Sequence, residues 1–335
     1  MDQNNSAPWF EDFGIGDDFS HVPSITITDG YAAIHQAIFG DRLRLPLDHH
    51  LSKLVTGDIL VNPSLVCNVA IGQSTFPSQR VMGNLFYRGL ILQRPVYIGD
   101  TISTQTRVVA LRQNRTKPGR AASGMVALEM HVTNQNAETV MLFWRCPMIP
   151  CRDEKAETGQ NDSFDFMPET LDETLLMAAI PKWDFSEFRS YSQFHSHSHS
   201  HFASLKVDEQ FKPEARDTVT LAPELVRLTL NMAMTHTDAA RSVYGKRLVY
   251  GGHTISLAAA QISRALPNML TILGWLTCDH LAPVFEEDVL RSEITIEKTH
   301  GLEEGGIVML HVESFLNRDN NEIKVLDWHL VTLFA

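Results

Sequence analysis

Two adjacent glycines followed by a histidine, Gly251-Gly252-His253, are the residues whose types and order point most directly to chemistry. The apolar stretch after them, which Pro267 ends, predicts a buried helix that begins at the glycines. The first amides of a helix lack partners within it and lie at the positive end of its dipole, so they can stabilise negative charge on a carbonyl oxygen. Tight helix packing is the alternative explanation for the glycines, and His253 either lines such a site or caps the helix.

A second group is a run in which histidine and serine alternate. Its members are His195, His197, His199 and His201. Alternation would place these rings on one face only in a strand, and no acidic or cysteine residue lies in register. The run lies at the end of a polar connecting segment. We expect adventitious metal affinity here, and no functional metal site.

The composition limits the classes of partner. The chain has 335 residues, 44% of them hydrophobic, which suggests two domains. It carries 28 Lys and Arg against 40 Asp and Glu, a net charge of −12 with His neutral. This balance argues against a nucleic acid or an anionic membrane as a partner, and a polyanionic ligand would need a local basic patch.

Cysteine spacing and the absence of export signals predict a compartment. The cysteines, Cys67, Cys146, Cys151 and Cys278, match no metal spacing. The polar first residues do not resemble a signal peptide, and no run of 18 apolar residues occurs. We therefore expect reduced thiols and a cytoplasmic protein.

The two halves of the chain repeat each other. Three pairs of segments match at an offset of 192 residues: FEDFGIGDDF with FASLKVDEQF, Thr26-Ile27-Thr28 with Thr218-Val219-Thr220, and Asn62-Pro63-Ser64-Leu65 with Thr254-Ile255-Ser256-Leu257. A fourth pair, which begins at Pro95 and Pro283, matches at an offset of 188. Matches at a nearly fixed offset indicate an internal duplication.

Each half shows the same order of expected elements. An aromatic-rich start leads to a first helix, then to an apolar helix, and then to long stretches of alternating hydrophobicity typical of half-buried strands. A central apolar helix followed by several antiparallel strands, twice over, is typical of a tandem hotdog of the α+β class. The predicted domains are residues 1–151 and 201–335, with residues 152–200 as a polar linker.

Three stretches carry a resemblance to a known family: FEDFGIGDDF at 10–19, IGDTISTQTRVVALRQN at 98–114, and GKRLVYGGHTISLA at 245–258 with DHLAP at 279–283. Through them the chain resembles the MaoC-like hydratase/dehydratase family, and within it the mesaconyl-CoA hydratase (methylmalyl-CoA dehydratase) branch. The resemblance implies a hydro-lyase that adds water to a short, branched or carboxylated enoyl-CoA, or removes it from the 3-hydroxyacyl-CoA.

The same resemblance implies which residues transfer protons. The family motif G-D-x-N-P-x-H-x-D matches the segment from Leu230 to Asp238, and places His236 on the catalytic His. Asn231 stands where the catalytic Asp is expected, and it can orient a water but cannot exchange a proton. Either His236 acts as both base and acid, or Asp238 or a carboxylate of the first half supplies the second group. Asp238 has an alternative role as the cap of a helix through Ala239-Ala240-Arg241.

In the first half, Gly40-Asp41 preserves the first pair of the motif, but no histidine follows in register. The resemblance therefore implies that the second half carries the chemistry, with Gly251 and Gly252 polarising the thioester, while the first half covers the acyl-CoA. Candidate substrate contacts are Tyr250, His253, Arg112, Arg115, Lys246 and Arg247, and for a free carboxylate Arg241 and Arg264. A core position for Tyr250 and a solvated surface position for the basic residues are the alternatives.

Two other functions compete with hydration. A hotdog can be a thioesterase, which a carboxylate in the middle of the buried helix would favour, but none occurs between Thr254 and Leu266. A non-catalytic acyl-CoA-binding hotdog is the second rival, supported by the missing catalytic Asp. For the hydratase we expect no metal, no cofactor beyond the CoA of the substrate, and a homodimer or higher homo-oligomer.

Overall fold

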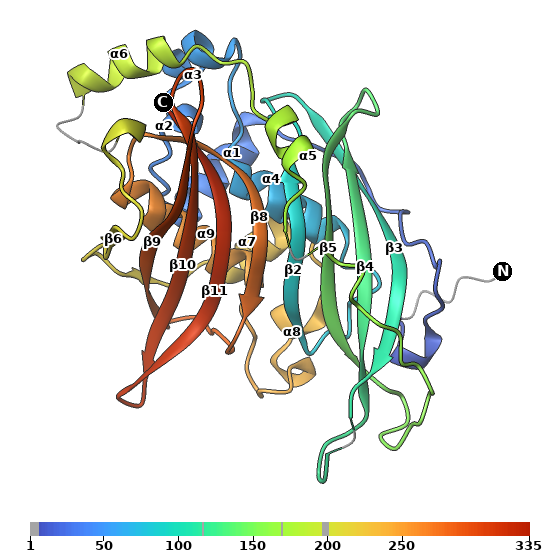
Figure 1. Cartoon of the computed structure of the whole chain (residues 1–335). Coiled ribbons are helices and arrows are strands. Elements are labelled where there is room, and N and C mark those ends of the chain that lie inside the picture. Colours follow the sequence, from blue (N-terminus) through green and yellow to red (C-terminus); the bar gives the residue numbers. More distant parts are fainter. Residues whose placement is uncertain (1–6, 116, 169, 196–200) are drawn as a thin grey trace.

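One broad, curved sheet with most of the helices on one side dominates the molecule (Figure 1). The computed structural model describes residues 7–115, 117–168, 170–195 and 201–335, and for residues 192–195 the backbone alone. These residues form an 11-stranded antiparallel sheet in the order β1-β3-β4-β5-β2-β8-β11-β10-β9-β6, with β7 paired to β9. The two halves of the chain meet where β2 pairs with β8, for example at Tyr87 and Cys278.

The elements follow the same order in both halves. The first half contains β1 (Ile25–Thr26), α1 (Asp29–Phe39), α2 (Arg44–Leu47), α3 (His49–Thr56), α4 (Pro63–Gln73), β2 (Gly83–Leu92), β3 (Thr101–Gln113), β4 (Ser123–Thr133) and β5 (Thr139–Pro150). The second contains β6 (Gln210–Phe211), β7 (Asp217–Thr218), α7 (Ala222–Leu228), α8 (Met234–Thr237), α9 (Gly251–Ala265), β8 (Met269–His280), β9 (Val289–Gly301), β10 (Gly306–Arg318) and β11 (Asn321–Phe334). This order confirms the predicted duplication.

Equivalent elements begin at offsets that shrink along the chain. Strands β1 and β7 begin 192 residues apart, α2 and α8 190 residues apart, and α4 and α9 188 residues apart. The match of Asn62-Pro63-Ser64-Leu65 with Thr254-Ile255-Ser256-Leu257 is therefore wrong by about one helical turn. The apolar helices begin instead at Pro63 and Gly251.

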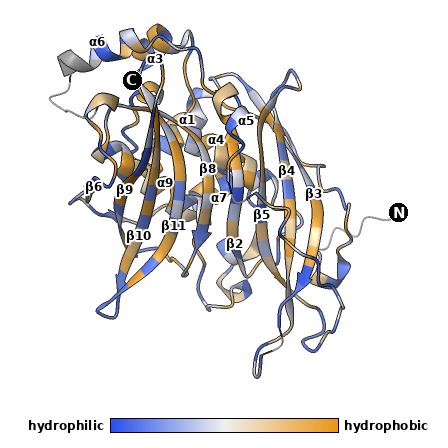
Figure 2. Cartoon of the chain, in the orientation of Figure 1, coloured by the Kyte–Doolittle hydropathy of each residue, from blue (hydrophilic) through white to orange (hydrophobic). Residues whose placement is uncertain are grey.

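Helices α4 and α9 form the centre of the core. Every residue of α4 is buried, as is the stretch of α9 from Gly252 to Ser263. The two helices contact each other, and Asn68 Nδ2 donates to Ser256 Oγ over 2.8 Å at their contact. Hydrophobic and hydrophilic residues alternate along the strands, so that one face of the sheet covers these helices (Figure 2). The core therefore joins both halves into one body.

Residues 152–195 pack against the rest of the molecule and are more than a polar linker. Pro168 lies over Gly89, where a Cβ would come within 2.5 Å of the proline ring. Helices α5 (Glu173–Ala178) and α6 (Phe185–His195) follow, and buried Phe188 of α6 belongs to the same cluster as Leu51 of α3. Of the histidine run, His195 ends α6, His201 is partly buried, and His197 and His199 lie outside the described residues.

The cysteines are all free and buried: Cys67, Cys146, Cys151 and Cys278. Burial raises the pKa of each thiol, for example that of Cys146 to about 12, so the thiols are protonated and poorly reactive. In the described part of the chain, no helix combines the length and the apolar character that a bilayer span requires.

Candidate active site

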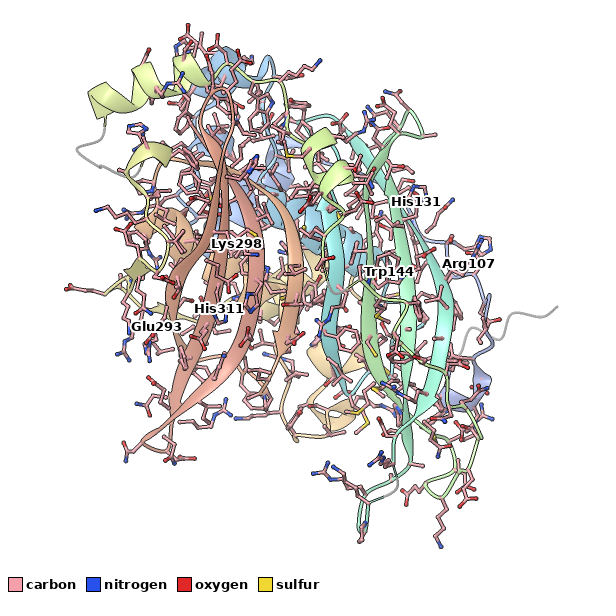
Figure 3. All side chains as sticks on the ribbon, in the orientation of Figure 1. Arg107, His131, Trp144, Glu293, Lys298 and His311 are labelled. Carbon is pink, nitrogen blue, oxygen red and sulfur yellow. The ribbon has the colours of Figure 1, made fainter. Side chains whose placement is uncertain are left out.

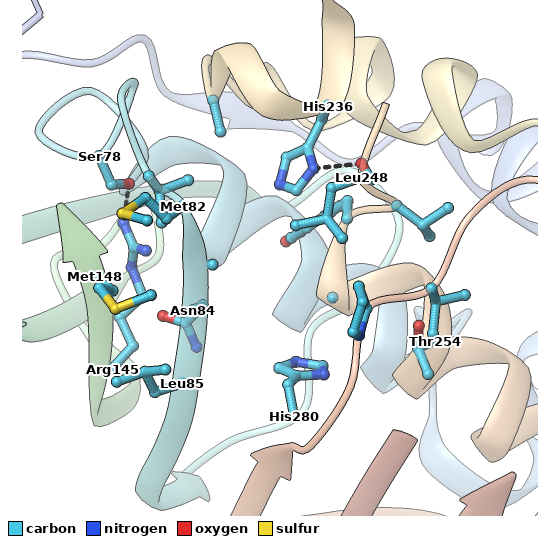
Figure 4. Close-up of a pocket in the computed structure, with 18 of the residues that line it drawn as sticks. Ser78, Met82, Asn84, Leu85, Arg145, Met148, His236, Leu248, Thr254 and His280 are labelled. Atoms are coloured by element: carbon cyan, nitrogen blue, oxygen red, sulfur yellow. Dashed lines mark hydrogen bonds between the residues drawn. The ribbon is translucent and has the colours of Figure 1, made fainter. Parts of the chain in front are cut away.

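A cavity of about 220 Å³ lies between the two halves, beside the start of α9. The first half supplies residues of α4, the loop after it, β2 and β5, and the second half supplies α8, the start of α9 and the segment 280–284. Figure 4 shows Arg145 and Asn84 on the side of the first half, and His236 and His280 on the side of the second. A ligand in this cavity would therefore touch both halves.

His236 reaches the cavity from the short helix α8. Its Nδ1 lies 2.7 Å from the carbonyl oxygen of Leu248, which can only accept, so Nδ1 carries the proton. The other ring nitrogen, Nε2, is then unprotonated and available as a base. Burial lowers the pKa of His236 to about 4, although the bond to Leu248 acts in the opposite direction. His236 is therefore a neutral imidazole with a fixed tautomer.

His280, the last residue of β8, is a second histidine in this cavity. Its Nε2 is buried and has no hydrogen-bond partner among the described residues. Burial lowers the pKa of His280 to about 4, and His236 also lowers it, which places the two rings within electrostatic reach. The sequence alone gave His280 no role, although it lies in the DHLAP stretch, and only its position at the cavity reveals it.

The two glycines at the start of α9 serve different purposes. Gly251 lines the cavity, and a Cβ there would lie 2.4 Å from His280 Nε2. Gly252 faces the core, where a Cβ would lie 2.1 Å from Asn68 Oδ1. Gly251 thus opens the cavity to the unpaired amides at the positive end of a 15-residue helix, and Gly252 lets α9 approach α4. Tight packing of the helix therefore explains Gly252, whereas Gly251 lines the cavity where the predicted oxyanion donors would lie.

Arg145 of β5 forms part of the opposite wall. It is 2% exposed, and its Nη2 donates to the carbonyl oxygen of Ser74 over 2.6 Å and to Ser78 Oγ over 2.8 Å. Tyr87 and Asn84 of β2 line the cavity beside it. The cavity therefore contains a buried cation as well as two neutral histidines.

A wider, open hollow of about 960 Å³ adjoins the cavity, and the two share Val81, Met82, Met148 and Tyr244. Five basic residues line it: Arg80, Arg115, Lys117, Arg120 and Arg241. This basic groove is the local positive patch that a polyanionic ligand requires on a chain of net charge −12.

Comparison with known proteins identifies the family. No family model matches the chain. A β-methylmalyl-CoA dehydratase of Chloroflexus aurantiacus is 30% identical over 300 residues, which cover 86% of this chain and 81% of that protein. A mesaconyl-CoA hydratase of Cereibacter sphaeroides is 26% identical over 294 residues, 87% of this chain and 83% of that protein. The chain belongs to the MaoC-like hydratase/dehydratase family.

Solved structures share the fold. A conserved hypothetical protein of Mycobacterium tuberculosis with a double hotdog fold superposes with a TM-score of 0.88 at 41% identity, over 98% of this chain and 99% of that one. A putative MaoC domain protein dehydratase of Chloroflexus aurantiacus gives a TM-score of 0.86 at 24% identity, over 100% and 99% of the two chains. The predicted tandem hotdog is confirmed, and as a member of this family the chain is a hydro-lyase.

The family motif can now be placed in the structure. Asn231 lines the cavity, but its Oδ1 accepts from the amide of Ala233 over 2.9 Å and so shapes the turn before α8. Asp238 does not line the cavity. It is exposed, and its Oδ1 accepts from Ala240 over 2.9 Å at the start of the 3₁₀ helix Ala239–Arg241. The expectation that Asp238 transfers a proton is therefore corrected in favour of its capping role.

Among the described residues, no carboxylate of the first half lines the cavity. Asp41 is buried away from the cavity, and its oxygens accept from Ser263 Oγ, the amide of Leu43 and Asn62 Nδ2. Asp41 accepts from the amide two residues ahead of it, in the turn before α2, just as Asn231 does in the turn before α8. The Asp of the family motif is thus kept in the first half as a structural residue.

Two residues beside the glycines divide between core and cavity. Tyr250 lines the cavity and is also buried, with its hydroxyl donating to the carbonyl oxygen of Asn68 over 3.1 Å. His253 faces the core, where it packs edge-on against Phe39 with ring centroids 4.8 Å apart. Burial lowers the pKa of His253 to about 3. His253 does not line the cavity, and it does not cap the helix either, because both of its ring nitrogens are buried without a hydrogen-bond partner among the described residues.

Most of the basic residues expected at the CoA phosphates lie elsewhere. The guanidinium of Arg112 stacks over Phe164, Lys246 lies over Phe285, and Arg247 pairs with Glu286. Arg264, a candidate for a carboxylate, pairs with Asp217. These groups already have partners, and none of them lines the cavity or the basic groove. Arg115 and Arg241 do line the groove.

The first half has a smaller counterpart of the cavity. This hollow of about 30 Å³ includes Pro63 at the start of α4, and Ala179, Pro181 and Trp183 of the connecting segment also line it. Trp183 donates its Nε1 hydrogen to Tyr97 Oη over 3.3 Å. Pro46 is the third residue of α2, as His236 is the third residue of α8. The counterpart therefore lacks a base and is occupied by the chain itself.

Potential metal ligands in the described residues lie on the outer face of the sheet. Two overlapping groups have suitable geometry: Glu297, His311 and His329, and His311, Glu313 and Asp327. Figure 3 shows His311 on the face of the sheet opposite the helices. The rings of His311 and His329 stack with centroids 4.1 Å apart, and they bond to Asp327 and Glu297. This cluster lies apart from the cavity.

Proposed function

We propose that the chain catalyses the reversible hydration of a 2-enoyl-CoA to a 3-hydroxyacyl-CoA at a single site, in the cavity between its halves. The observation that carries this proposal is the position of His236, whose tautomer is fixed by Leu248 and whose free Nε2 shares a cavity with the start of α9 at Gly251. A base and donors to an oxyanion are the two groups that addition to an enoyl thioester requires. The names of the curated relatives support the same reaction.

The start of α9 polarises the thioester in this mechanism. The thioester oxygen lies against the free amides at Gly251, where the developing enolate charge is stabilised. His236 Nε2 takes one proton from water as the water oxygen bonds to the β-carbon. The imidazolium then returns that proton to the α-carbon as the enolate collapses. The β-carbon thereby receives the hydroxyl of the water and the α-carbon its proton, and His236 returns to its neutral form.

His280 takes the part that the family motif gives to an Asp. Its ring lines the same cavity as His236 and lies beside Gly251, where it would help to position the attacking water. Burial lowers the pKa of His280 to about 4, so the ring is neutral. Asn231 is a positioning residue, because its side-chain oxygen is used in the turn before α8.

The basic groove would hold the phosphates of CoA, and the cavity would hold the acyl group. Arg80 and Arg241 line this groove, which shares Tyr244 with the cavity. The small cavity suits a short acyl group, branched or carboxylated, such as those named for the relatives. The homo-oligomer implied by the resemblance stays a prediction.

The test is an assay of enoyl-thioester absorbance across a panel that includes mesaconyl-CoA and crotonyl-CoA. We expect loss of the double bond with at least one member, and a fall in kcat of about 1000-fold in the His236→Gln variant. His300→Gln, on the exposed part of β9, is the matched control and should retain the wild-type rate. Release of free CoA thiol without hydration would instead identify a thioesterase, and full turnover by His236→Gln would exclude the mechanism.

A further inference from the structure

Arg145 is a buried cation without a carboxylate partner. Its side chain lines the cavity, and its two hydrogen bonds, both from Nη2, go to the neutral oxygens of Ser74 and Ser78. Nε is buried without a partner, and Nη1 donates to no group among the described residues. No carboxylate of the described chain forms an ion pair with Arg145, whereas Arg88 and Arg264 each pair with an aspartate.

The groups that interact electrostatically with Arg145 do not neutralise it. They are Tyr87, Tyr250 and Cys146, and burial raises the pKa of all three, so each stays protonated. Burial also lowers the pKa of Arg145, but a guanidinium keeps its proton in proteins. A buried charge without a counter-ion is costly, and proteins rarely keep one unless a ligand pairs with it.

The position of Arg145 defines where such a ligand group would lie. Arg145 belongs to β5 of the first half, across the cavity from His236 and His280 (Figure 4). If the thioester lies against Gly251, as the proposed function requires, the far end of a short acyl chain extends toward Arg145. An acyl group with a second, free carboxylate would place that anion against Nη1, the guanidinium nitrogen that is neither hydrogen-bonded in the described residues nor sealed off as Nε is.

We propose that Arg145 binds the free carboxylate of the acyl group, so that the enzyme selects thioesters of short unsaturated dicarboxylic acids. This inference rests on the proposed function and identifies the residue that sets its specificity. Arg241 and Arg264, the candidates from the sequence, do not serve this purpose, because Arg241 lines the groove outside and Arg264 pairs with Asp217. Asn84 Oδ1 is buried without a partner beside Arg145. This oxygen can only accept, so it would bond the free carboxyl of the substrate only if that carboxyl were protonated.

The experiment compares mesaconyl-CoA with the same thioester esterified by methanol at its free carboxylate. The two substrates have nearly the same shape, but only the first is an anion. We expect the wild-type enzyme to prefer the acid over the ester by about 100-fold in kcat/KM, the value of a lost charged hydrogen bond in a dry site. In Arg145→Met this ratio should fall to about one, chiefly through loss of turnover of the acid.

Arg94→Met is the matched control. Arg94 lines the counterpart hollow of the first half and pairs with Glu138, so its loss should leave the acid-to-ester ratio unchanged. The acid-to-ester ratio of the wild-type enzyme is measured without any variant. The test therefore still has a deciding result if Arg145→Met folds poorly.

The outcomes separate this inference from the proposed function. Equal turnover of acid and ester by the wild-type enzyme, or a preference that survives in folded Arg145→Met, would overturn the role of Arg145 and leave the hydratase intact. A panel in which neither of these substrates nor crotonyl-CoA reacts would overturn both proposals.

Discussion

The two halves of this chain have the same elements in the same order, but the second contributes to an open cavity of about 220 Å³ and the first has a filled hollow of about 30 Å³. Two positions account for most of the difference. His236 of α8 corresponds to Pro46 of α2, and Gly251 at the start of α9 corresponds to Pro63 at the start of α4. The hotdog scaffold therefore provides a helix start facing the sheet, and a few side chains decide whether it becomes a site.

The start of α4 and the space beside it differ from those of α9. Proline at a helix start removes the amide hydrogen that would meet an oxyanion. Trp183 and its neighbours line the hollow beside α4 and leave only about 30 Å³ open. The wall that the first half supplies, with Arg145 and Tyr87, belongs instead to the cavity between the halves.

Moving the histidine from α8 of the second half to α2 of the first should lower kcat more than any other change proposed. His236→Gln should lower kcat by about 1000-fold, because the fixed Nε2 is lost. Adding Pro46→His to that variant should recover nothing, since Trp183 fills the hollow beside α4. Steady-state kinetics of the single and double variants check this, and recovery of activity in the double variant would contradict the distinction between the halves.

A methyl group at the start of α9 should close the working site while leaving the fold intact. Gly251→Ala puts a Cβ within 2.4 Å of His280 Nε2, so we expect a fall of about 100-fold in kcat. Gly252→Ala should instead lower the free energy of unfolding by about 2 kcal/mol, because its Cβ meets Asn68 in the core. Kinetics and urea denaturation of both variants separate the two roles, and identical effects would refute them.

Emptying the hollow of the first half should affect stability and not activity. Trp183→Ala removes a half-buried indole from the cluster with Tyr97, and should cost about 2 kcal/mol of unfolding free energy. The kcat of the folded variant should stay within about twofold of wild type, because turnover takes place in the other cavity. A large loss of kcat at full folding would show that the hollow takes part in catalysis.

The pH dependence should reveal the burial of the working histidine. The pKa of His236 is lowered to about 4, so the base stays unprotonated down to that pH and is lost only as the pH falls through it. We expect kcat/KM to change little between pH 7.5 and 5.5, whereas a histidine of ordinary pKa would lose about 90% of its neutral form at the lower value. A pH–rate profile with an acid limb near 6.5 would contradict this environment for His236.

The sequence was sufficient to predict the fold and to single out His236. The repeat, the apolar helices and the family stretches predicted a tandem hotdog, and the motif around His236 led to the residue that the cavity contains. The helix register could not be read in the same way, because an apolar helix matches itself nearly as well one turn away. Gly251 and Gly252 were found, but only contacts could assign them different tasks.

The sequence did not predict Arg145 and His280 as residues of the cavity, and the reason is the same for both. Both lie in strands, where the pairing partner and the facing loops decide whether a polar side chain meets solvent or a cavity. For Asp238 and His253 the sequence led to the opposite error, because it predicted site residues that do not line the cavity. Each lies within two residues of one that lines the cavity, but the side chain of Asp238 caps a 3₁₀ helix and that of His253 packs against Phe39 in the core.

The shared wall of the cavity has a consequence for any attempt to divide the protein. His236 and His280 come from one half and Arg145 from the other, so each half carries only some of the residues that line the cavity. A chain cut between residues 195 and 201 would yield two fragments that are inert apart and active only in complementation. The two halves of the duplication thus share one cavity, and neither half can form it alone.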